Sequence, residues 1–305
     1  MTDQTSESGS LLHQLSEQLA DAVARVAPGV VHVHARSRYG ASGVVWADGI
    51  VVTADHVVEQ EDNITVTLAD GQNLAASLVG RDPDTDIAVL RVQGLPTPAV
   101  DRGVSPRVGS LALLVARPGR SEQASVATIR SVGDAPRRGR RAQSLPLIAV
   151  DVTFHPGYSG GGLLDVDGRL LGIATSGFGR GQGGGVIIGL SRVEQVVSAL
   201  LQHGRIRRGY LGVTSQPVEI PASMRASIGD QASGLLIIGV AAGSPAEQGG
   251  LLMGDVLITI ADEPVNGPRD LRAQLTAERV GQTIPVKVLR GGQVQTLSVR
   301  VGEQT

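Results

Sequence analysis

Ser159 has the surroundings of a nucleophile. It lies in the segment HPGYSGGGLLD, with glycines at positions 157 and 160–162. Glycines let the backbone approach a substrate closely and allow N–H groups to point toward it. A serine hydroxyl in such a turn is a candidate for covalent chemistry, although Gly-Ser clusters taken alone more often mark ordinary loops.

A serine nucleophile needs a neighbouring base and a group that orients that base. The chain offers six histidines, which are His13, His32, His34, His56, His155 and His203. Among them, His56 ends the strand-like run VVTADHVV, where an active-site loop is expected to start. The next acidic segment, DPDTDIAVL, places Asp86 at the entrance to a buried strand, so the order along the chain is His, Asp, Ser.

Composition and charge exclude several classes of protein. Basic residues number 27 and acidic residues 29, so the formal net charge of −2 argues against a nucleic-acid partner. No cysteine is present, which excludes disulfides. No run is apolar enough to span a membrane, and the first residues show no basic start followed by an apolar run. As written, the sequence predicts a cytoplasmic protein, whereas a missing leader would make it extracytoplasmic.

The apolar pattern predicts a mainly β protein. Glycine makes up 41 of the 305 residues, which is typical of turn-rich structure. Apolar residues spaced by three and four predict a helix over residues 11–26. The short Val- and Ile-rich runs that follow form two groups of about six strands, which suggests two small barrels. The Asp-Gly pairs at 48–49 and 70–71 are expected in hairpin turns. A helix over residues 192–203, stopped by Gly204, closes this unit, and a small α+β module follows a boundary near 204–208.

Three of these segments resemble the catalytic blocks of one family. TADHVV, DPDTDIAVL and PGYSGGGLLD look like those of trypsin-like serine proteases of the HtrA (Deg) type, and YLGV, AGSPAEQGGL and GDVLITIADEPV resemble the PDZ domain that follows the protease in that family. The resemblance implies a chymotrypsin-like double β-barrel followed by a PDZ domain. The implied division is a tail and helix in residues 1–24, a protease domain in 25–204 and a PDZ domain in 208–302.

The resemblance also implies roles for individual residues. Ser159 would be the nucleophile, His56 the general base and Asp86 the carboxylate that orients the imidazole. The N–H groups of Gly157 and Ser159 would form an oxyanion hole, and no metal or cofactor is needed. The expected activity is a serine endopeptidase that cleaves unfolded or damaged proteins in protein quality control, assembled as a homotrimer.

The PDZ-like module is expected to bind peptide C-termini. Its carboxylate-binding loop would be Tyr210, Leu211, Gly212 and Val213. An extended peptide would add to the neighbouring strand edge, and a helix carrying Leu271, Gln274 and Leu275 would form the other wall of the groove. The alternative is that YLGV only begins a strand that packs into its own domain.

Two positions depart from the family pattern. Tyr158 stands where the family usually has Asn, and Gly162 stands where it usually has Pro or Ala, so the oxyanion loop is open to question. The alternative function is a catalytically inactive scaffold or peptide-binding protein. In relatives that cut after Lys or Arg, an Asp stands six residues before the nucleophile; here Thr153 occupies that position, which implies a preference for small or aliphatic side chains.

Several other motifs have weaker readings. Gly157 to Gly161 fit the G-x-S-x-G elbow of esterases, but the order of the triad argues against that fold. The spacing of Gly179, Gly181 and Gly184 matches a dinucleotide loop, yet a strand-like run follows it. Asp165 to Gly168 predict a hairpin and not a calcium loop. His32 and His34 would share one face of a strand, a spacing that suits a metal but lacks further ligands. The basic run of Arg137, Arg138, Arg140 and Arg141 is expected to be a solvated loop, with a regulatory or acidic-partner contact as the alternative.

Overall fold

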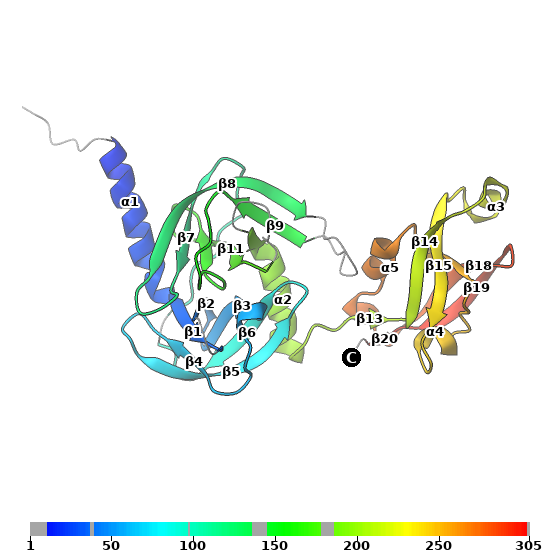
Figure 1. Cartoon of the computed structure of the whole chain (residues 1–305), viewed down its shortest axis with the longest axis horizontal. Helices are drawn as coiled ribbons and strands as arrows, with labels where there is room; N and C mark the ends of the chain where they lie inside the picture. Colours follow the sequence, from blue (N-terminus) through cyan, green and yellow to red (C-terminus); the bar gives the residue numbers. More distant parts are fainter. Residues whose placement is uncertain (1–10, 37–39, 97, 136–144, 178–185, 304–305) are drawn as a thin grey trace, which may run out of the picture. The chain divides into compact units, whose positions relative to one another are not determined.

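The computed structural model describes residues 11–36, 40–96, 98–135, 145–177 and 186–303. These residues form two compact units that divide after Arg205. The basic run at 137–141 and the glycines at 179, 181 and 184 lie outside the described residues. Figure 1 follows the chain through the elements of each unit.

Unit 1 contains two closed six-stranded barrels, which confirms the predicted double barrel. The first has the strand order β1-β2-β3-β6-β5-β4 and the second the order β10-β11-β12-β9-β8-β7. The strands of the first barrel are β1 Val30–His34, β2 Ala41–Ala47, β3 Ile50–Ala54, β4 Ile64–Thr67, β5 Asn73–Asp82 and β6 Ile87–Val92. Those of the second are β7 Leu111–Ala116, β8 Gln123–Ala135, β9 Leu145–Val150, β10 Gly162–Leu164, β11 Leu170–Thr175 and β12 Val186–Gly189.

Tight turns and small aliphatic side chains build both barrels. Gly49 has a φ of 65° and Gly71 a φ of 89°, so both predicted Asp-Gly turns use glycine in the left-handed region, where a Cβ is disfavoured. The barrel interiors are filled mainly by Val, Leu, Ile and Ala. Trp46, the one tryptophan of the chain, is 6% exposed on β2 and therefore reports on the first barrel.

Helix α2 (Leu190–His203) closes unit 1, beginning two residues before the predicted start. It packs on β5, β6 and β11 through Val193, Val196, Val197 and Leu200, all buried. Gly204 ends the helix with a φ of 69° and an N–H bond to the carbonyl of Leu200, as predicted. A Cβ on Gly80 of β5 would lie 2.2 Å from the Gly204 carbonyl oxygen, so the helix end and this strand approach too closely for any side chain.

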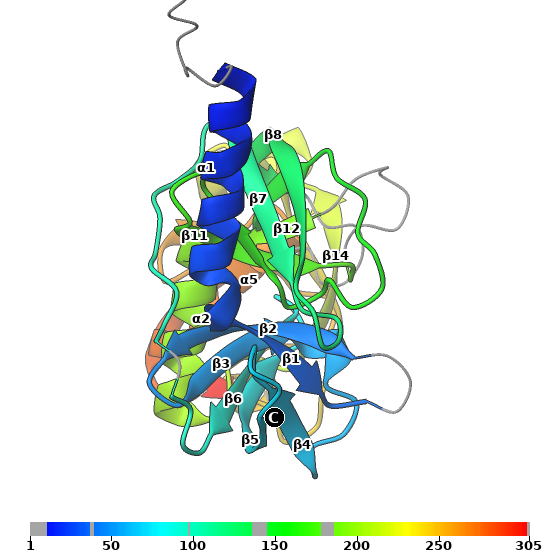
Figure 2. The ribbon, with the colours of Figure 1, turned by 90° about the vertical axis from the view of Figure 1, so that its left-hand side faces the viewer.

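Helix α1 (Leu11–Val26) is continuous, as its spacing predicts, and leads through the 3-10 turn η1 (Ala27–Gly29) into β1. Figures 1 and 2 show its first turns extending beyond the barrels. Only Ala22 and Val26 are buried, whereas Leu11 and Leu12 are 80% and 76% exposed. Among the described residues, no helix combines the length and the apolar character required to cross a bilayer.

Unit 2 is the small α+β module that the sequence predicts. Its main sheet has the order β14-β15-β16-β18-β19, with β17 paired to β16, and β13 pairs separately with β20. The strands are β13 Gly209–Tyr210, β14 Val213–Glu219, β15 Ser233–Val240, β16 Val256–Ile260, β17 Glu263–Pro264, β18 Thr283–Arg290, β19 Gln293–Arg300 and β20 Gly302–Glu303. The helices are α3 Ala222–Arg225, η3 Ala226–Ile228, α4 Pro245–Gln248, α5 Pro268–Gln274 and η4 Ala277–Arg279.

Candidate active site

His56 lies in the 3-10 turn η2 (Asp55–Val57), directly after β3. Its Nδ1 lies 2.8 Å from Oδ2 and 3.0 Å from Oδ1 of Asp86, and its backbone N–H donates to Oδ1 at 2.8 Å. One carboxylate therefore holds both the backbone and the ring of His56. The side chain of Asp86 is 6% exposed and that of His56 33%, so the acid is shielded while the ring still reaches solvent.

Asp86 has an uncommon backbone conformation, with a φ of 59° just before β6 begins. Asp tolerates this left-handed region better than bulky residues do. The carbonyl of Asp86 accepts from the N–H of Asp55, and the hydroxyl of Thr175 donates to Oδ2. Because β6 pairs with β3, the neighbouring ends of these two strands bring Asp86 and His56 together. Sequence reasoning missed Thr175, which ends β11.

Ser159 follows a tight turn from His155 to Tyr158, and residues 155–159 together form the active-site turn. The Tyr158 N–H donates to the His155 carbonyl at 3.1 Å. Pro156 is the second residue of this turn, and Gly157, which has a φ of 89°, is the third. This arrangement is that of a type II turn, which favours glycine at the third position. After Ser159, Gly160 has a φ of 86°, and a Cβ on it would lie 1.9 Å from the carbonyl oxygen of Ser42. Only glycine fits there.

Two buried backbone donors remain available beside Ser159. Gly157 and Ser159 are both buried, yet within the described part of the chain neither N–H has a hydrogen-bond acceptor. Buried N–H groups are otherwise almost always paired. Donors left free next to a candidate nucleophile are suited to receive an oxygen that becomes negative during acyl transfer.

The two departures from the family pattern have structural explanations. Tyr158 is 3% exposed and belongs to the core of the second barrel, with its ring 6.4 Å from that of Phe154. Gly162 begins β10, where a Cβ would come within 3.0 Å of Leu170 and 3.3 Å of Val44. The tyrosine side chain is therefore accommodated in the core, and the glycine avoids crowding between the barrels.

Ser42 on β2 ties the first barrel to the active-site turn. Its N–H donates to the Ser159 carbonyl at 3.0 Å, and its Oγ donates to the Gly157 carbonyl at 2.7 Å. The same Oγ accepts from the N–H of Arg117 at 2.8 Å, and the Ser42 carbonyl accepts from Thr53 Oγ1 at 2.7 Å. Ser42 is completely buried. Nothing in the local sequence singles this residue out.

Arg117 is a second residue that the sequence did not reveal. Its guanidinium is buried and donates to the carbonyls of Ala27, Val30 and Arg120, and it pairs with Glu122 at 3.1 Å. Its own carbonyl lies 3.0 Å from Nδ1 of His32. The guanidinium of Arg117 therefore binds the chain at the start of β1. The backbone N–H of the same residue binds Ser42, which in turn contacts the active-site turn.

The hydroxyl of Ser176 lies between the candidate nucleophile and the candidate base. Ser176 Oγ is 3.0 Å from Ser159 Oγ and 3.2 Å from His56 Nε2. No hydrogen bond joins Ser159 and His56 directly among the contacts of the described residues. Sequence reasoning missed Ser176; the only signal is a Thr-Ser pair at the end of a buried strand.

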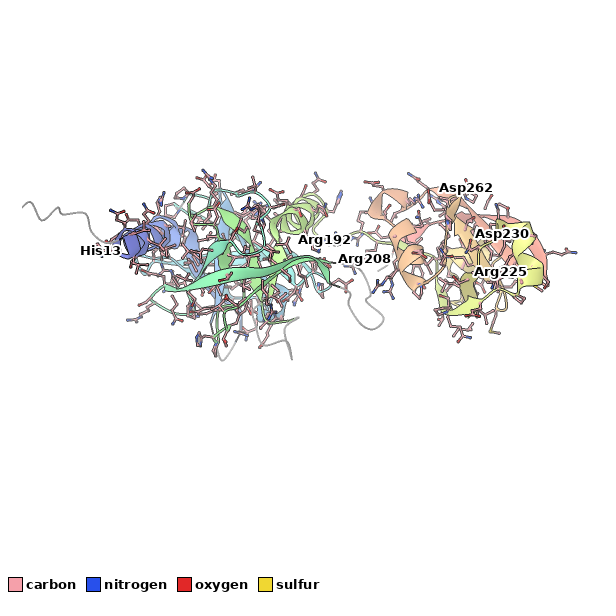
Figure 3. The ribbon with its side chains drawn as sticks, turned by 90° about the horizontal axis from the view of Figure 1, so that it is seen from above. His13, Arg192, Arg208, Arg225, Asp230 and Asp262 are labelled. Atoms are coloured by element: carbon pink, nitrogen blue, oxygen red, sulfur yellow. The ribbon has the colours of Figure 1, made fainter. Side chains whose placement is uncertain are left out.

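The other five histidines can also be placed. His13 is on α1, as Figure 3 shows, and His203 ends α2. His155 is exposed at the start of the active-site turn. His32 is buried while His34 is exposed, and their rings contact edge to face at 4.0 Å.

Other predicted features of the two units can also be placed. The hairpin predicted at 165–168 joins β10 to β11: Asp165 Oδ1 accepts the N–H of Asp167, and Gly168 has a φ of 83°. In unit 2, Leu211 is buried and Gly212 has a φ of 83°.

The loop between β13 and β14 has free donors of its own. In the part of unit 2 that the structure describes, the N–H groups of Leu211 and Gly212 have no acceptor. β14 is the edge strand of its sheet, and α5 contacts it. Of the residues expected on that helix, Leu271 is buried, and Gln274 accepts a hydrogen bond from Arg279.

Comparison with known proteins gives the class of protein. Residues 41–173 match the trypsin-like peptidase domain, and residues 209–301 match the PDZ domain. Fold and site therefore define a trypsin-like peptidase domain followed by one PDZ domain.

Individual relatives narrow this class to a family. A probable periplasmic serine endoprotease, DegP-like, from Chlamydia muridarum is 34% identical over 272 residues, which cover 86% of this chain and 53% of the relative. The protein of the same name from Rhizobium meliloti is 36% identical over 276 residues, covering 86% and 53%. This chain thus spans about half the length of these curated relatives.

Solved structures extend the likeness over nearly the whole chain. The HtrA-type protease AlgW with a decapeptide superposes with a TM-score of 0.79 at 30% identity, covering 94% of this chain and 99% of that one. A serine endoprotease from Yersinia pestis gives a TM-score of 0.78 at 29% identity, covering 94% and 98%. The chain belongs to the HtrA family of trypsin-like serine proteases with a PDZ domain.

We expect Ser42→Ala to destabilise unit 1 by about 1–3 kcal/mol, because it leaves the buried N–H of Arg117 and the buried carbonyl of Gly157 without their partner. Denaturant unfolding followed by Trp46 fluorescence measures this free energy. Ser77→Ala, an exposed change on β5, is the matched control and should shift it by less than about 0.5 kcal/mol. Equal stability of the two variants would contradict the role assigned to Ser42.

We expect unit 1 to lose stability as the pH falls below 6.5. Burial lowers the pKa of His32 below its ordinary 6.5, outweighing the opposite effect of the Arg117 carbonyl. The unfolded chain then binds a proton that the native state does not, so this contribution is intact above pH 6.5 and declines toward the lower native pKa, by at most about 1.4 kcal/mol per pH unit.

The measurement is the Trp46 unfolding midpoint between pH 8 and pH 5. In His32→Asn, whose amide retains a donor for the Arg117 carbonyl, the decline should be smaller than in the wild type. His203→Asn, an exposed change at the end of α2, should retain the wild-type profile. Parallel profiles for all three proteins would show that His32 does not set the dependence.

Proposed function

We propose that this protein is a serine endopeptidase that cleaves unfolded polypeptides through an acyl-enzyme. The observation that carries the proposal is the site itself: His56 held by Asp86, Ser159 in a glycine turn, and two free N–H groups beside it. Support comes from the relatives named serine endoprotease, 34% and 36% identical to this chain.

Each residue has a defined task in this reaction. Asp86 accepts a hydrogen bond from the Nδ1–H of His56, which fixes the tautomer that leaves Nε2 as the acceptor. Ser159 Oγ attacks the peptide carbonyl, and its proton passes to His56. The resulting oxyanion is received by the N–H groups of Gly157 and Ser159, and protonated His56 then protonates the leaving amine. A water molecule then attacks the acyl-enzyme in the same way: His56 takes its proton, and Ser159 is released as the leaving group.

The finer features implied by the family remain proposals. We infer an extracytoplasmic location, because the curated relatives are named periplasmic, in place of the cytoplasmic one that the sequence suggested. The homotrimer and the role in protein quality control rest on the family resemblance. The preference for small or aliphatic side chains rests on Thr153, which is exposed ahead of the active-site turn.

We expect a fluorophosphonate probe to label Ser159 in the purified protein, because a base-activated serine attacks phosphorus as it attacks a carbonyl. Mass mapping of the adduct identifies the residue, and cleavage of unfolded casein measures peptidase activity. Ser159→Ala should abolish both signals, and His56→Ala should reduce both at least about 100-fold. Without labelling or cleavage, also in the presence of unfolded protein, the inactive scaffold would be the better description.

We also propose that the PDZ domain binds peptide C-termini. A carboxylate would accept hydrogen bonds from the free N–H groups of Leu211 and Gly212, and the peptide would extend the sheet at the open edge of β14. The solved HtrA-type structure with a decapeptide supports peptide binding in the family. Gly212 is central, because its φ is 83° and a Cβ on it would lie 2.3 Å from the Cβ of Ser244.

Isothermal calorimetry of the full chain with an apolar decapeptide should give tighter binding for the free carboxylate than for the C-terminal amide, by about 10-fold. Gly212→Ala should lose this difference. Gly229→Ala is the matched control, because Gly229 has a φ of 73° but no atom within 4 Å of a built Cβ, and binding should persist. Equal affinity for both peptides in the wild type would rule out carboxylate capture.

A further inference from the structure

Ser176 places its hydroxyl between Ser159 and His56, two residues that contact each other directly in a Ser-His-Asp triad. It follows Thr175, the last residue of β11, and is exposed. Its Oγ is 3.0 Å from Ser159 Oγ and 3.2 Å from His56 Nε2, and its N–H donates to Ser159 Oγ at 3.3 Å. Three hydrogen bonds thus connect Ser176 to the two residues between which a proton must move.

The direction of each hydrogen bond in this chain follows from donor counting. His56 Nδ1 faces both oxygens of Asp86, which are acceptors, so Nδ1 carries the ring proton and Nε2 accepts. Because Nε2 accepts, the single proton of the Ser176 hydroxyl points to it. Ser176 Oγ can then only accept from Ser159, whose hydroxyl must be the donor. The protons therefore line up from Ser159 through Ser176 to His56.

The segment that carries Ser176 is also fixed to the acid. Thr175 donates its hydroxyl to Asp86 Oδ2 and accepts the N–H of Gly177 at 2.9 Å. Two successive residues at the end of β11 therefore contact opposite ends of the system, Thr175 the carboxylate and Ser176 the nucleophile. The Thr175 contacts thus hold the backbone from which the Ser176 side chain extends.

We propose that Ser176 is a catalytic residue that relays the proton between Ser159 and His56. This inference rests on the proposed peptidase function. As Ser159 Oγ bonds to the substrate carbonyl carbon, its O–H bond breaks and the proton passes to Ser176 Oγ. The original proton of Ser176 moves in the same step to His56 Nε2, and the carbonyl π electrons move to oxygen. Ser176 is neutral before and after, so no further reactant is needed.

The test compares Ser176→Ala with Ser176→Thr by the rate of fluorophosphonate labelling of Ser159. The alanine removes the relay, and the maximal labelling rate should fall at least about 10-fold, since positioned proton transfer is worth roughly 10²–10⁴-fold. The threonine retains a hydroxyl and should remain within about 3-fold of the wild type, a much smaller change than the loss expected for alanine. Ser77→Ala is the control for an exposed serine far from the chemistry, and Trp46 unfolding checks that each variant folds.

A proton inventory separates the relay from a merely structural role. In mixtures of H2O and D2O, the plot of the wild-type labelling rate against the deuterium fraction should be curved, because more than one proton moves in the transition state. In Ser176→Ala, one of these moving protons should be lost from the plot. A Ser176→Ala protein that labels as fast as the wild type, or whose inventory is unchanged, overturns the relay. If the wild type itself is not labelled, the peptidase proposal fails, and the relay fails with it. If the wild type and Ser176→Ala are labelled at equal rates, only the relay fails.

Discussion

The candidate active site depends on a buried serine, Ser42, that connects the first barrel to the turn of the second barrel that carries Ser159. Every polar group of Ser42 is used: its N–H and Oγ bind carbonyls of the active-site turn, its Oγ accepts from Arg117, and its carbonyl accepts from Thr53. Because His56 and Asp86 belong to the first barrel and Ser159 to the second, their relative placement requires a rigid connection. Hydrogen bonds out of contact with water are directional and costly to leave unmade, so they fix this geometry closely.

The unusual glycine content serves the same junction. Gly160 allows the nucleophile turn to lie against the carbonyl of Ser42, and Gly157 supplies the left-handed backbone that leaves its N–H free. The interiors of the barrels contain mainly aliphatic residues, and among the described residues Tyr158 is the one buried aromatic side chain in the core cluster of the second barrel. The residue that looked most disruptive in the sequence is thus part of the packing that holds the turn.

The acid is more strongly fixed than the nucleophile. Asp86 receives hydrogen bonds from the backbone and ring of His56 and from Thr175, and its own backbone lies in a sparsely populated region. Strained backbone of this kind persists only where the surroundings determine it. Among the hydrogen bonds of the described residues, Ser159, by contrast, is connected to His56 only through the exposed Ser176.

Sequence periodicity predicted the strands of both barrels, the two long helices and the hairpin turns, because these depend on neighbours a few residues apart. The order of His56, Asp86 and Ser159 was also readable, since each lies in a recognisable local segment. Ser42, Thr175 and Ser176 were not readable, because their roles arise from contacts with residues far away in the chain. Only the closure of two barrels brings β2 and the end of β11 beside the start of β6, and the hydroxyls of Ser42, Thr175 and Ser176 acquire their contacts from that proximity and not from local sequence.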